Sequence, residues 1–420
     1  MSAIEETVNQ IGIQAKAASK ELARISGAKK NEALLAMAKH ILANEKIIIT
    51  SNEKDIKNAK QKGLSESFID RLKLDSESIT SIANTLKDIA SFEDPVGKVL
   101  ANWTRPNGLQ ISRVSTPLGV IGIIYESRPN VTADAGALCL KSGNASILRG
   151  GSDSLHSSLA IHACLVKGLK EAGISEHAIQ IINDTDREVV KLMLQGINKS
   201  IDVIVPRGGK SLVAEVEKEA KVPVFGHLEG ICHIYVDKEA DEDKSVNVCL
   251  NAKMRRPGIC GAVETILIHK DIANSFVPII VNALSTQGCE VRGCKLSQLL
   301  SDQVLPATEE DWSTEYLLPI VSIKIAESTD DAVSHIEQFS TGHTESIMTE
   351  NLNTASYFQN TIDSAIVMHN TSTQFADGGE FGLGGEIGIA TGKFHARGPV
   401  GIEQLTSFKY LVNGNGHIRS

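Results

Sequence analysis

Apolar side chains recur at helical spacing through the first part of the chain, up to about residue 90. They fall on one face of a helix: Val8, Ile11, Ala15, Ala18 and Leu22, then Leu34, Leu35, Ala38, Ile41 and Leu42. This period predicts a series of amphipathic helices. Gly27 and the Ser51-Asn52 pair interrupt the pattern and predict breaks between helices.

Residues 98–115 follow a different pattern, that of a β-hairpin. Two strand-like runs, 99–103 and 109–114, flank an Arg-Pro-Asn-Gly segment over 105–108. Asn-Gly between two such runs is a strong turn signal. Because a two-stranded arm is only marginally stable by itself, the hairpin is expected to pack on another part of the protein or on a second subunit.

From residue 117 onward, short apolar runs alternate with amphipathic segments. The runs predict strands over 120–124, 145–148, 179–182 and 201–205, and the segments predict helices over 131–141, 155–172, 187–195 and 210–220. A second series of strands is predicted over 231–236, 265–268, 321–325, 346–348 and 364–368. Strands that alternate with helices favour parallel sheets with right-handed crossovers, so the predicted fold class is α/β with two Rossmann-like parallel-sheet domains.

Composition and charge narrow the class of protein. The chain has 420 residues, 42% of them hydrophobic and 22% charged, which is typical of a globular protein with more than one domain. Lys and Arg number 42 against 51 Asp and Glu, a net charge of −9. This balance argues against a nucleic-acid or anionic-membrane partner, both of which favour a basic surface.

Neither secretion nor membrane insertion is predicted. The N-terminus is acidic and lacks the apolar stretch of a signal peptide. The longest apolar runs, 120–125 and 276–284, are shorter than the roughly 18 residues of a membrane helix. The seven cysteines are odd in number, irregularly spaced and without a C-x-x-C pair, so neither a disulfide framework nor a structural zinc site is expected. A reducing cytoplasm is the expected location.

Cys260 is the candidate nucleophile. It follows a Pro-Gly turn and precedes Gly261, which predicts a loop where backbone N–H groups can face a ligand. Arg255 and Arg256 lie just upstream, and nearby positive charge favours the thiolate, the reactive form of cysteine. A buried structural thiol is the simpler interpretation for the other six cysteines.

Two strand-to-helix turns are candidates for binding the phosphates of a dinucleotide. Gly208, Gly209 and Lys210 follow the strand predicted over 201–205, and Arg149 precedes a Gly-Gly turn after the strand over 145–148. Glycines let the backbone approach an anion, and a helix N-terminus attracts it. Neither strand ends in an acid placed to bind a ribose 2′-hydroxyl, so that NADP is favoured over NAD.

A metal site is not predicted. His227, Cys232 and His233 lie close together in the sequence, and a metal site there is conceivable. However, no H-E-x-x-H motif and no second Cys/His pair accompanies them.

Several segments resemble the aldehyde dehydrogenase superfamily: residues 117–122 and 142–144, the Cys260 loop, and Glu315 with Pro319 four positions later. Within the superfamily, further motifs are most similar to the branch that reduces an acyl phosphate: residues 125–130, 256–260, 335–336, 343–347, 381–388 and 395–401. The resemblance extends from about residue 10 to the C-terminus.

The resemblance implies roles for individual residues. Cys260 corresponds to the nucleophile, and Glu315 to the acid that holds the nicotinamide ribose. Arg149 stands where the superfamily usually has a lysine that contacts the adenosine ribose. Ser152 stands where NAD-preferring members often carry a glutamate, which again favours NADP.

Two positions depart from the superfamily pattern. The asparagine that stabilises the oxyanion does not align cleanly; Ser127 or Asn130 takes its place, and Asn130 is preferred. The glutamate that activates water to hydrolyse the thioester is missing, and His227 stands near its position. This loss suits a reductase, because a base that activates water would divert the thioester to the acid.

The implied fold is aldehyde-dehydrogenase-like. A cofactor-binding domain is expected over 1–225, with a small β arm at about 98–115, and a catalytic domain over 226–365. Residues 366–420 are expected to form a closing segment and a strand near Leu411 that, with the arm, joins subunits of a homo-oligomer.

The implied reaction is the NADPH-dependent reduction of L-glutamate 5-phosphate to L-glutamate 5-semialdehyde and phosphate through a cysteine thioester, the second step of proline biosynthesis from glutamate. Arg128, Arg256 and Arg397 are candidate ligands for the substrate's anionic groups. Association with glutamate 5-kinase is a further expectation.

Two other classes of protein are considered. A dehydrogenase that oxidises a semialdehyde would need a carboxylate base near Cys260, which only Glu229 or Glu264 could supply. A non-catalytic binding protein on the same fold is the second alternative. The intact Cys260 loop and both cofactor turns argue against it.

Overall fold

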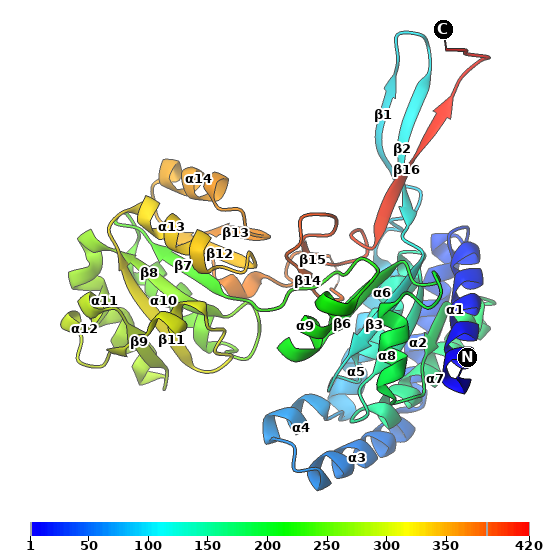
Figure 1. Cartoon of the computed structure of the whole chain (residues 1–420), viewed down its shortest axis with the longest axis horizontal. Coiled ribbons are helices and arrows are strands. Elements are labelled where there is room, and N and C mark those ends of the chain that lie inside the picture. Colours follow the sequence, from blue (N-terminus) through cyan, green and yellow to red (C-terminus); the bar gives the residue numbers. More distant parts are fainter. Residues whose placement is uncertain (1, 384, 420) are drawn as a thin grey trace. The chain divides into compact units, whose positions relative to one another are not determined.

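The computed structural model describes residues 2–383 and 385–419, which form two compact units, each built on a parallel sheet covered by helices (Figure 1). Unit 1 comprises Met1–Gly226, Gly382–Gly388 and Val400–Ser420, and unit 2 comprises His227–Phe381 and Ile389–Pro399. The α/β class predicted from the sequence is confirmed. Gly384, which belongs to the glycine-rich motif over 381–388, lies outside the described residues.

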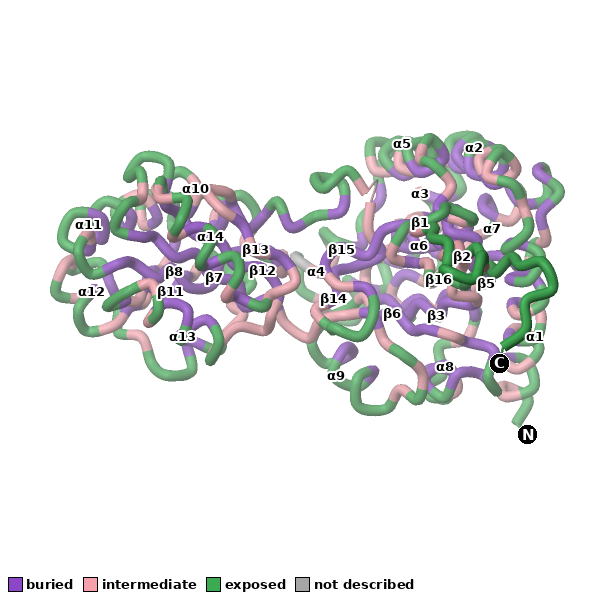
Figure 2. The backbone as a smooth tube through the Cα atoms, turned by 90° about the horizontal axis from the view of Figure 1, so that it is seen from above, coloured by how far each residue is buried: buried purple, intermediate pink, exposed green. Residues whose placement is uncertain are grey.

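The sheet of unit 1 has four parallel strands in the order β5-β4-β3-β6. They are β3 (Val120–Tyr125), β4 (Ala145–Gly150), β5 (Ile179–Ile181) and β6 (Val203–Arg207). The connecting helices are those predicted: α6 (Val131–Lys141), α7 (Leu155–Glu171), α8 (Arg187–Leu194) and α9 (Lys210–Glu219). Every residue of β3 is buried, as expected for a central parallel strand covered on both faces (Figure 2).

Five helices precede this sheet: α1 (Ala3–Leu22), α2 (Gly27–Ala43), α3 (Glu45–Gln61), α4 (Glu66–Leu72) and α5 (Ser76–Ser91). The break predicted at Gly27 is confirmed, because Ser26 caps α2 by accepting a hydrogen bond from the Lys29 backbone N–H.

The break predicted at Ser51-Asn52 is wrong, since α3 runs through both residues. Asn52 is buried, and its amide donates to the Leu72 carbonyl at 2.8 Å and accepts from the Leu74 N–H at 2.8 Å. Its polar groups are therefore satisfied by tertiary contacts and do not compete with the helix backbone.

The predicted hairpin over 98–115 is confirmed as β1 (Val99–Thr104) and β2 (Gln110–Pro117). The turn closes where the Gly108 N–H donates to the Arg105 carbonyl at 2.8 Å, with a φ of +93° that glycine adopts without strain. Strand β16 (Thr406–Asn413) pairs with β2, and Figure 1 shows the resulting three-stranded arm extending from unit 1.

Unit 2 contains a seven-stranded parallel sheet in the order β10-β9-β11-β8-β7-β12-β13. Its strands are β7 (Cys232–Val236), β8 (Val263–His269), β9 (Glu290–Gly293), β10 (Leu305–Pro306), β11 (Ile320–Ala326), β12 (Thr344–Met348) and β13 (Ile366–His369). Its α-helices are α10 (Glu242–Met254), α11 (Lys270–Thr286), α12 (Lys295–Leu300), α13 (Thr329–Phe339) and α14 (Leu352–Thr361). Strands β9 and β10 were not predicted, because neither is an uninterrupted apolar run.

The last part of the chain, predicted as a closing segment over 366–420, contributes residues to both units. In unit 2, β13 pairs with β12, and β14 (Ile389–Ala390) pairs with β15 (Gly398–Pro399). Residues 382–388 and β16 belong to unit 1. The division follows from strand pairing, because these short strands complete sheets on both units. Within the described residues, no helix is long and apolar enough to cross a membrane.

Candidate active site

Cys260 lies in unit 2 on the loop that joins α10 to β8. Its side chain is half-buried and packs against a small apolar cluster that includes Met368 and Ile389. Of the other cysteines, only Cys294 is also partly exposed. Burial raises the pKa of Cys249 to about 12. Burial is also the main cause that raises the pKa of Cys289, to about 11. Both thiols therefore stay protonated at neutral pH. Cys260 therefore differs from the buried thiols in the exposure of its side chain, as the prediction requires.

The backbone around Cys260 is held by the segment that leads into β7. A Cβ atom on Gly230 would lie 2.1 Å from the Cys260 carbonyl oxygen, so only glycine fits there. The Cys232 thiol donates to the same carbonyl at 3.2 Å. One carboxylate oxygen of Glu315 accepts from the Gly230 N–H at 2.9 Å. Glu315 therefore supports the nucleophile loop through Gly230, a contact the sequence did not predict.

Two imidazoles lie beside the Cys260 thiol. The Cys260 sulfur and one ring nitrogen each of His227 and His343 lie within 4.8 Å of one another. The two rings meet edge to face with centroids 4.7 Å apart. His227 Nδ1 donates to the Ile389 carbonyl at 2.7 Å, because a carbonyl oxygen can only accept.

His343 is a neighbour of Cys260 that sequence reasoning missed, since it entered only as part of a family motif. It is fully buried, and its Nδ1 lies 2.9 Å from the Thr344 hydroxyl and 3.6 Å from the Cys232 sulfur. Its Nε2 has no hydrogen-bond partner among the described residues. The available signal was a histidine directly before the strand β12.

His233 does not join this cluster. Its Nδ1 contacts the Glu345 carboxylate at 3.0 Å, and both side chains are fully buried. Its sequence neighbour Cys232 has different contacts, since the Cys232 sulfur lies 3.6 Å from His343 Nδ1 and donates to the Cys260 carbonyl. The sequence-adjacent set of His227, Cys232 and His233 is therefore not brought together as a unit.

The carboxylate of Glu264 is engaged elsewhere. One of its oxygens accepts from Lys253 Nζ at 2.5 Å, and both side chains are fully buried. The other oxygen faces the Leu317 N–H at 3.5 Å. A carboxylate that is paired in this way is a poor candidate for activating water, which weakens the dehydrogenase alternative.

In unit 1, Asn130 stands directly before α6, and its side-chain amide donates to Asp134 at 2.8 Å. Burial raises the pKa of Asp134 to about 6, against the opposing effects of this hydrogen bond and of the positive charge of Arg207. An amide group has two N–H donors, so one remains after the contact with Asp134. Ser127, the alternative oxyanion donor, has a φ of +49°.

The two predicted cofactor turns lie at the same edge of the unit 1 sheet. Tyr125 at the end of β3 pairs with both Gly150 on β4 and Arg207 on β6, so the carboxyl ends of these strands are level. This edge is where open α/β sheets bind dinucleotides.

At this edge Arg149 suits an anionic ligand, whereas the Glu126 carboxylate would have to move away from one. A Cβ on Gly208 would lie 2.6 Å from a carboxylate oxygen of Glu126, and the Gly209 N–H faces the same oxygen at 3.4 Å. An acceptor oxygen therefore already occupies the N-terminus of α9, where a phosphate would bind. Arg149 donates from Nη2 to the Thr185 carbonyl at 3.1 Å, while its Nε is buried and finds no hydrogen-bond partner in the part of the chain that the structure describes.

The three arginines proposed to bind substrate differ in their surroundings. Arg397 forms an ion pair with Asp363 at 2.6 Å, so a substrate anion would have to compete with that carboxylate. Arg256 is exposed on the Cys260 loop, and Arg128 is partly exposed in unit 1. Arg397 is therefore the weakest of the three candidates.

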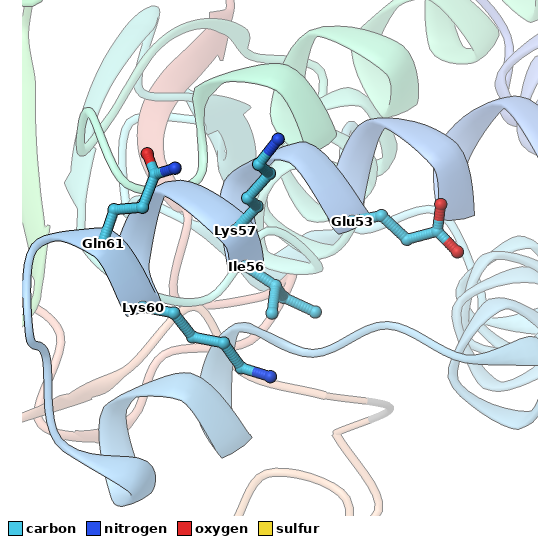
Figure 3. Close-up of a pocket in the computed structure, with 5 residues that line it drawn as sticks. All are labelled: Glu53, Ile56, Lys57, Lys60 and Gln61. Atoms are coloured by element: carbon cyan, nitrogen blue, oxygen red, sulfur yellow. The ribbon is translucent and has the colours of Figure 1, made fainter.

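A cavity of about 510 Å³ lies along α3 and is lined by Glu53, Ile56, Lys57, Lys60 and Gln61 (Figure 3). No predicted site residue is among the residues that line it. The residues that line it all come from one helix and include no cysteine or histidine, so the Cys260 surroundings remain the candidate site.

Comparisons with known proteins show the family of the chain. The model described as the aldehyde dehydrogenase family matches residues 1–291 and 303–411. Gamma-glutamyl phosphate reductase from Parvibaculum lavamentivorans is 57% identical over 412 residues, which cover 98% of this chain and 97% of that protein. The same-named protein of Brucella suis is 56% identical over 416 residues, which cover 99% of each chain.

A solved structure extends the likeness to three dimensions. The crystal structure of gamma-glutamyl phosphate reductase from Thermotoga maritima matches with a TM-score of 0.96 and 44% identity, covering 98% of this chain and 100% of that chain. The resemblance inferred from the sequence motifs is therefore confirmed. The chain belongs to the aldehyde dehydrogenase family and, within it, to the gamma-glutamyl phosphate reductases.

Proposed function

We propose that the chain catalyses the NADPH-dependent reduction of L-glutamate 5-phosphate to L-glutamate 5-semialdehyde and phosphate, the second step of proline biosynthesis. The observation that carries the proposal is the 55–57% identity, over nearly the full chain, to proteins named gamma-glutamyl phosphate reductase. The half-buried Cys260 thiol between two imidazoles supports it, because acyl transfer needs an accessible nucleophile.

In the first step, the Cys260 thiolate attacks the γ-carbonyl carbon of the acyl phosphate. A C–S bond forms, the C–O bond to phosphate breaks, and phosphate leaves with its electron pair. Asn130 is our candidate for the side-chain donor that stabilises the oxyanion, together with a backbone N–H. The product of this step is a thioester on Cys260.

In the second step, the thioester is reduced and the thiolate is expelled. The hydride that reduces the thioester carbonyl carbon would come from NADPH when it is bound. Glu264 is paired with Lys253, and His227 stands where aldehyde dehydrogenases carry their glutamate base. We infer that no carboxylate activates water at the thioester, so that the aldehyde forms and not glutamate.

The residues proposed to hold NADP are Arg149, Gly208, Gly209, Lys210 and Glu315. Arg149 supports a choice of NADP over NAD, because a guanidinium with an unpartnered buried N–H suits the ribose 2′-phosphate. Glu315, which accepts from the Gly230 N–H with one carboxylate oxygen, is assigned to the nicotinamide ribose.

We also propose that the substrate carboxylate and phosphate are bound by Arg128 and Arg256, with Arg397 as the third candidate. The exposed apolar arm supports a homo-oligomer. Association with glutamate 5-kinase and a cytoplasmic location complete the proposal.

The reverse reaction tests the proposal directly. L-Glutamate 5-semialdehyde and NADP are supplied with and without phosphate, and NADPH formation is followed, with Cys260→Ala as the matched control. Sustained turnover is expected only with phosphate, or with arsenate in its place. Sustained turnover without either anion would mean that the protein hydrolyses its own thioester, and the reductase assignment would then be withdrawn in favour of a dehydrogenase.

A further inference from the structure

The side chains around Cys260 also have the composition of a transition-metal site. Thiolate and imidazole are the ligand types that Zn²⁺ prefers. Cys260, His227 and His343 each offer one such atom, and the three atoms lie within 4.8 Å of one another. In a tetrahedral zinc site, neighbouring ligand atoms are roughly 3.3–3.6 Å apart, so small side-chain rotations would bring these atoms to the required spacing.

The hydrogen bonds of the two histidines favour metal binding through Nε2. His227 Nδ1 donates to the Ile389 carbonyl, which leaves the lone pair of the neutral ring on Nε2. A backbone carbonyl that accepts from the far ring nitrogen is a common outer partner of metal-bound histidine. The corresponding nitrogen of His343, Nε2, is fully buried and has no hydrogen-bond partner among the described residues.

An unpartnered buried nitrogen is costly, so its presence beside a thiol and a second imidazole points to a ligand. Cys260 and His227 are only half-buried, which leaves an entry path for an ion. Three protein ligands leave one coordination position for water or an anion, the arrangement of an exchangeable site.

We propose that Cys260, His227 and His343 form an inhibitory site for Zn²⁺. Binding converts the Cys260 thiol to a zinc-bound thiolate and releases its proton to solvent. An occupied site blocks the nucleophile, so that the metal acts as a reversible inhibitor and not as a cofactor. The inference concerns the thiol itself and stands apart from the identity of the acyl substrate.

Cobalt serves as the spectroscopic probe, because Co²⁺ takes the same ligands as Zn²⁺ and absorbs visibly when bound by thiolate. The full chain, kept reduced in phosphate-free buffer, is titrated with Co²⁺. The expected result is a thiolate-to-cobalt charge-transfer band with the visible bands of a tetrahedral ion, both removed by one equivalent of Zn²⁺. In parallel, Zn²⁺ should slow the alkylation of Cys260 by iodoacetamide.

Variants then assign the ligands. Cys260→Ala should lose the charge-transfer band, and His343→Ala or His227→Ala should weaken Zn²⁺ binding by at least about tenfold. Cys294→Ala, which removes the other partly exposed thiol, is the control and should bind as the unmodified protein does. His343→Gln is the second variant if His343→Ala does not fold.

No charge-transfer band in the unmodified protein, or an unchanged band in Cys260→Ala, would overturn the proposal. Equal Zn²⁺ affinity in the unmodified protein and in both histidine variants would show binding at adventitious surface groups and would overturn it as well. None of these readouts uses catalytic activity, so the failure of this inference is distinguishable from the failure of the proposed function.

Discussion

Lys253 and Glu264 form a fully buried ion pair, 2.5 Å between Nζ and a carboxylate oxygen, at the two ends of the loop that carries Cys260. Lys253 lies in the last turn of α10, and Glu264 is the second residue of β8. The pair therefore joins the helix that ends before the nucleophile to the strand that begins after it. Leu317, which faces the second Glu264 oxygen, links the segment that bears Glu315 to the same pair.

The first prediction concerns this ion pair. Lys253→Met leaves Glu264 buried and uncompensated, so the free energy of unfolding should fall by about 3–5 kcal/mol. The double variant Lys253→Met/Glu264→Leu removes both charges and should recover most of that loss. Chemical denaturation of the three proteins at neutral pH measures the effect. A double variant no more stable than the single one would show that packing, and not the unpaired charge, dominates.

The second prediction concerns the nucleophile. Cys260→Ser and Cys260→Ala should both abolish reduction of the acyl phosphate, because a serine hydroxyl is hardly ionised at neutral pH and alanine has no nucleophile. NADPH affinity, followed by fluorescence titration, should be unchanged in both. More than a few per cent of the activity in Cys260→Ala would contradict the covalent mechanism.

The third prediction concerns the choice of cofactor. Arg149→Ala should weaken NADPH binding more than NADH binding, because the lost charge-assisted hydrogen bonds are to the 2′-phosphate. The ratio of the two dissociation constants is the measurement. Lys210→Ala is the comparison variant, with a smaller expected effect. An equal loss for both cofactors would mean that Arg149 does not bind that phosphate.

The fourth prediction concerns the pH dependence of stability. Burial, and after it the proximity of His233 and Lys324, lowers the pKa of His335 to about 3. Lys324 Nζ lies 2.9 Å from His335 Nδ1. In the unfolded state the pKa of His335 is near 6.5, so the unfolded chain binds the proton at a higher pH than the folded protein does. The stability that comes from keeping His335 neutral is therefore complete above about pH 6.5 and is lost as the pH falls. Between pH 7 and pH 5 the loss should be about 2 kcal/mol.

His335→Asn tests this assignment, since an amide can accept from Lys324 but does not titrate. Its free energy of unfolding should be lower than that of the unmodified protein at pH 7 and should vary less between pH 7 and pH 5. Parallel pH profiles for the two proteins would assign the acid sensitivity to another group.

The fifth prediction concerns assembly. The three-stranded arm exposes a set of large apolar side chains: Val99, Leu100, Trp103, Phe408, Tyr410, Leu411 and Val412. Such a surface is expected to be covered by another copy of the chain. Deleting residues 100–112 should lower the native mass measured by light scattering. A full-length chain that is already monomeric would contradict the prediction.

The sequence by itself determined most of the secondary structure and singled out Cys260 as the candidate nucleophile. The α6 prediction over 131–141 matches the structure, and the first-unit strands lie within two residues of those predicted. The spacing of apolar residues along the chain is a local property that can be read directly from the sequence. Cys260 was identified for the same reason, because the turn and the charges that mark it are its neighbours in the chain.

Tertiary structure decided what surrounds that nucleophile. His343 and His227 reach Cys260 from separate segments, and Lys253 pairs with Glu264 across the loop. Asn52 shows the same limit, since a polar residue that predicts a helix break is instead satisfied by distant partners. Such contacts depend on which strands are neighbours in a sheet and on which face of a strand a side chain lies. The local sequence pattern shows neither the order of the strands in a sheet nor these long-range contacts. Only the folded structure therefore brings these groups together.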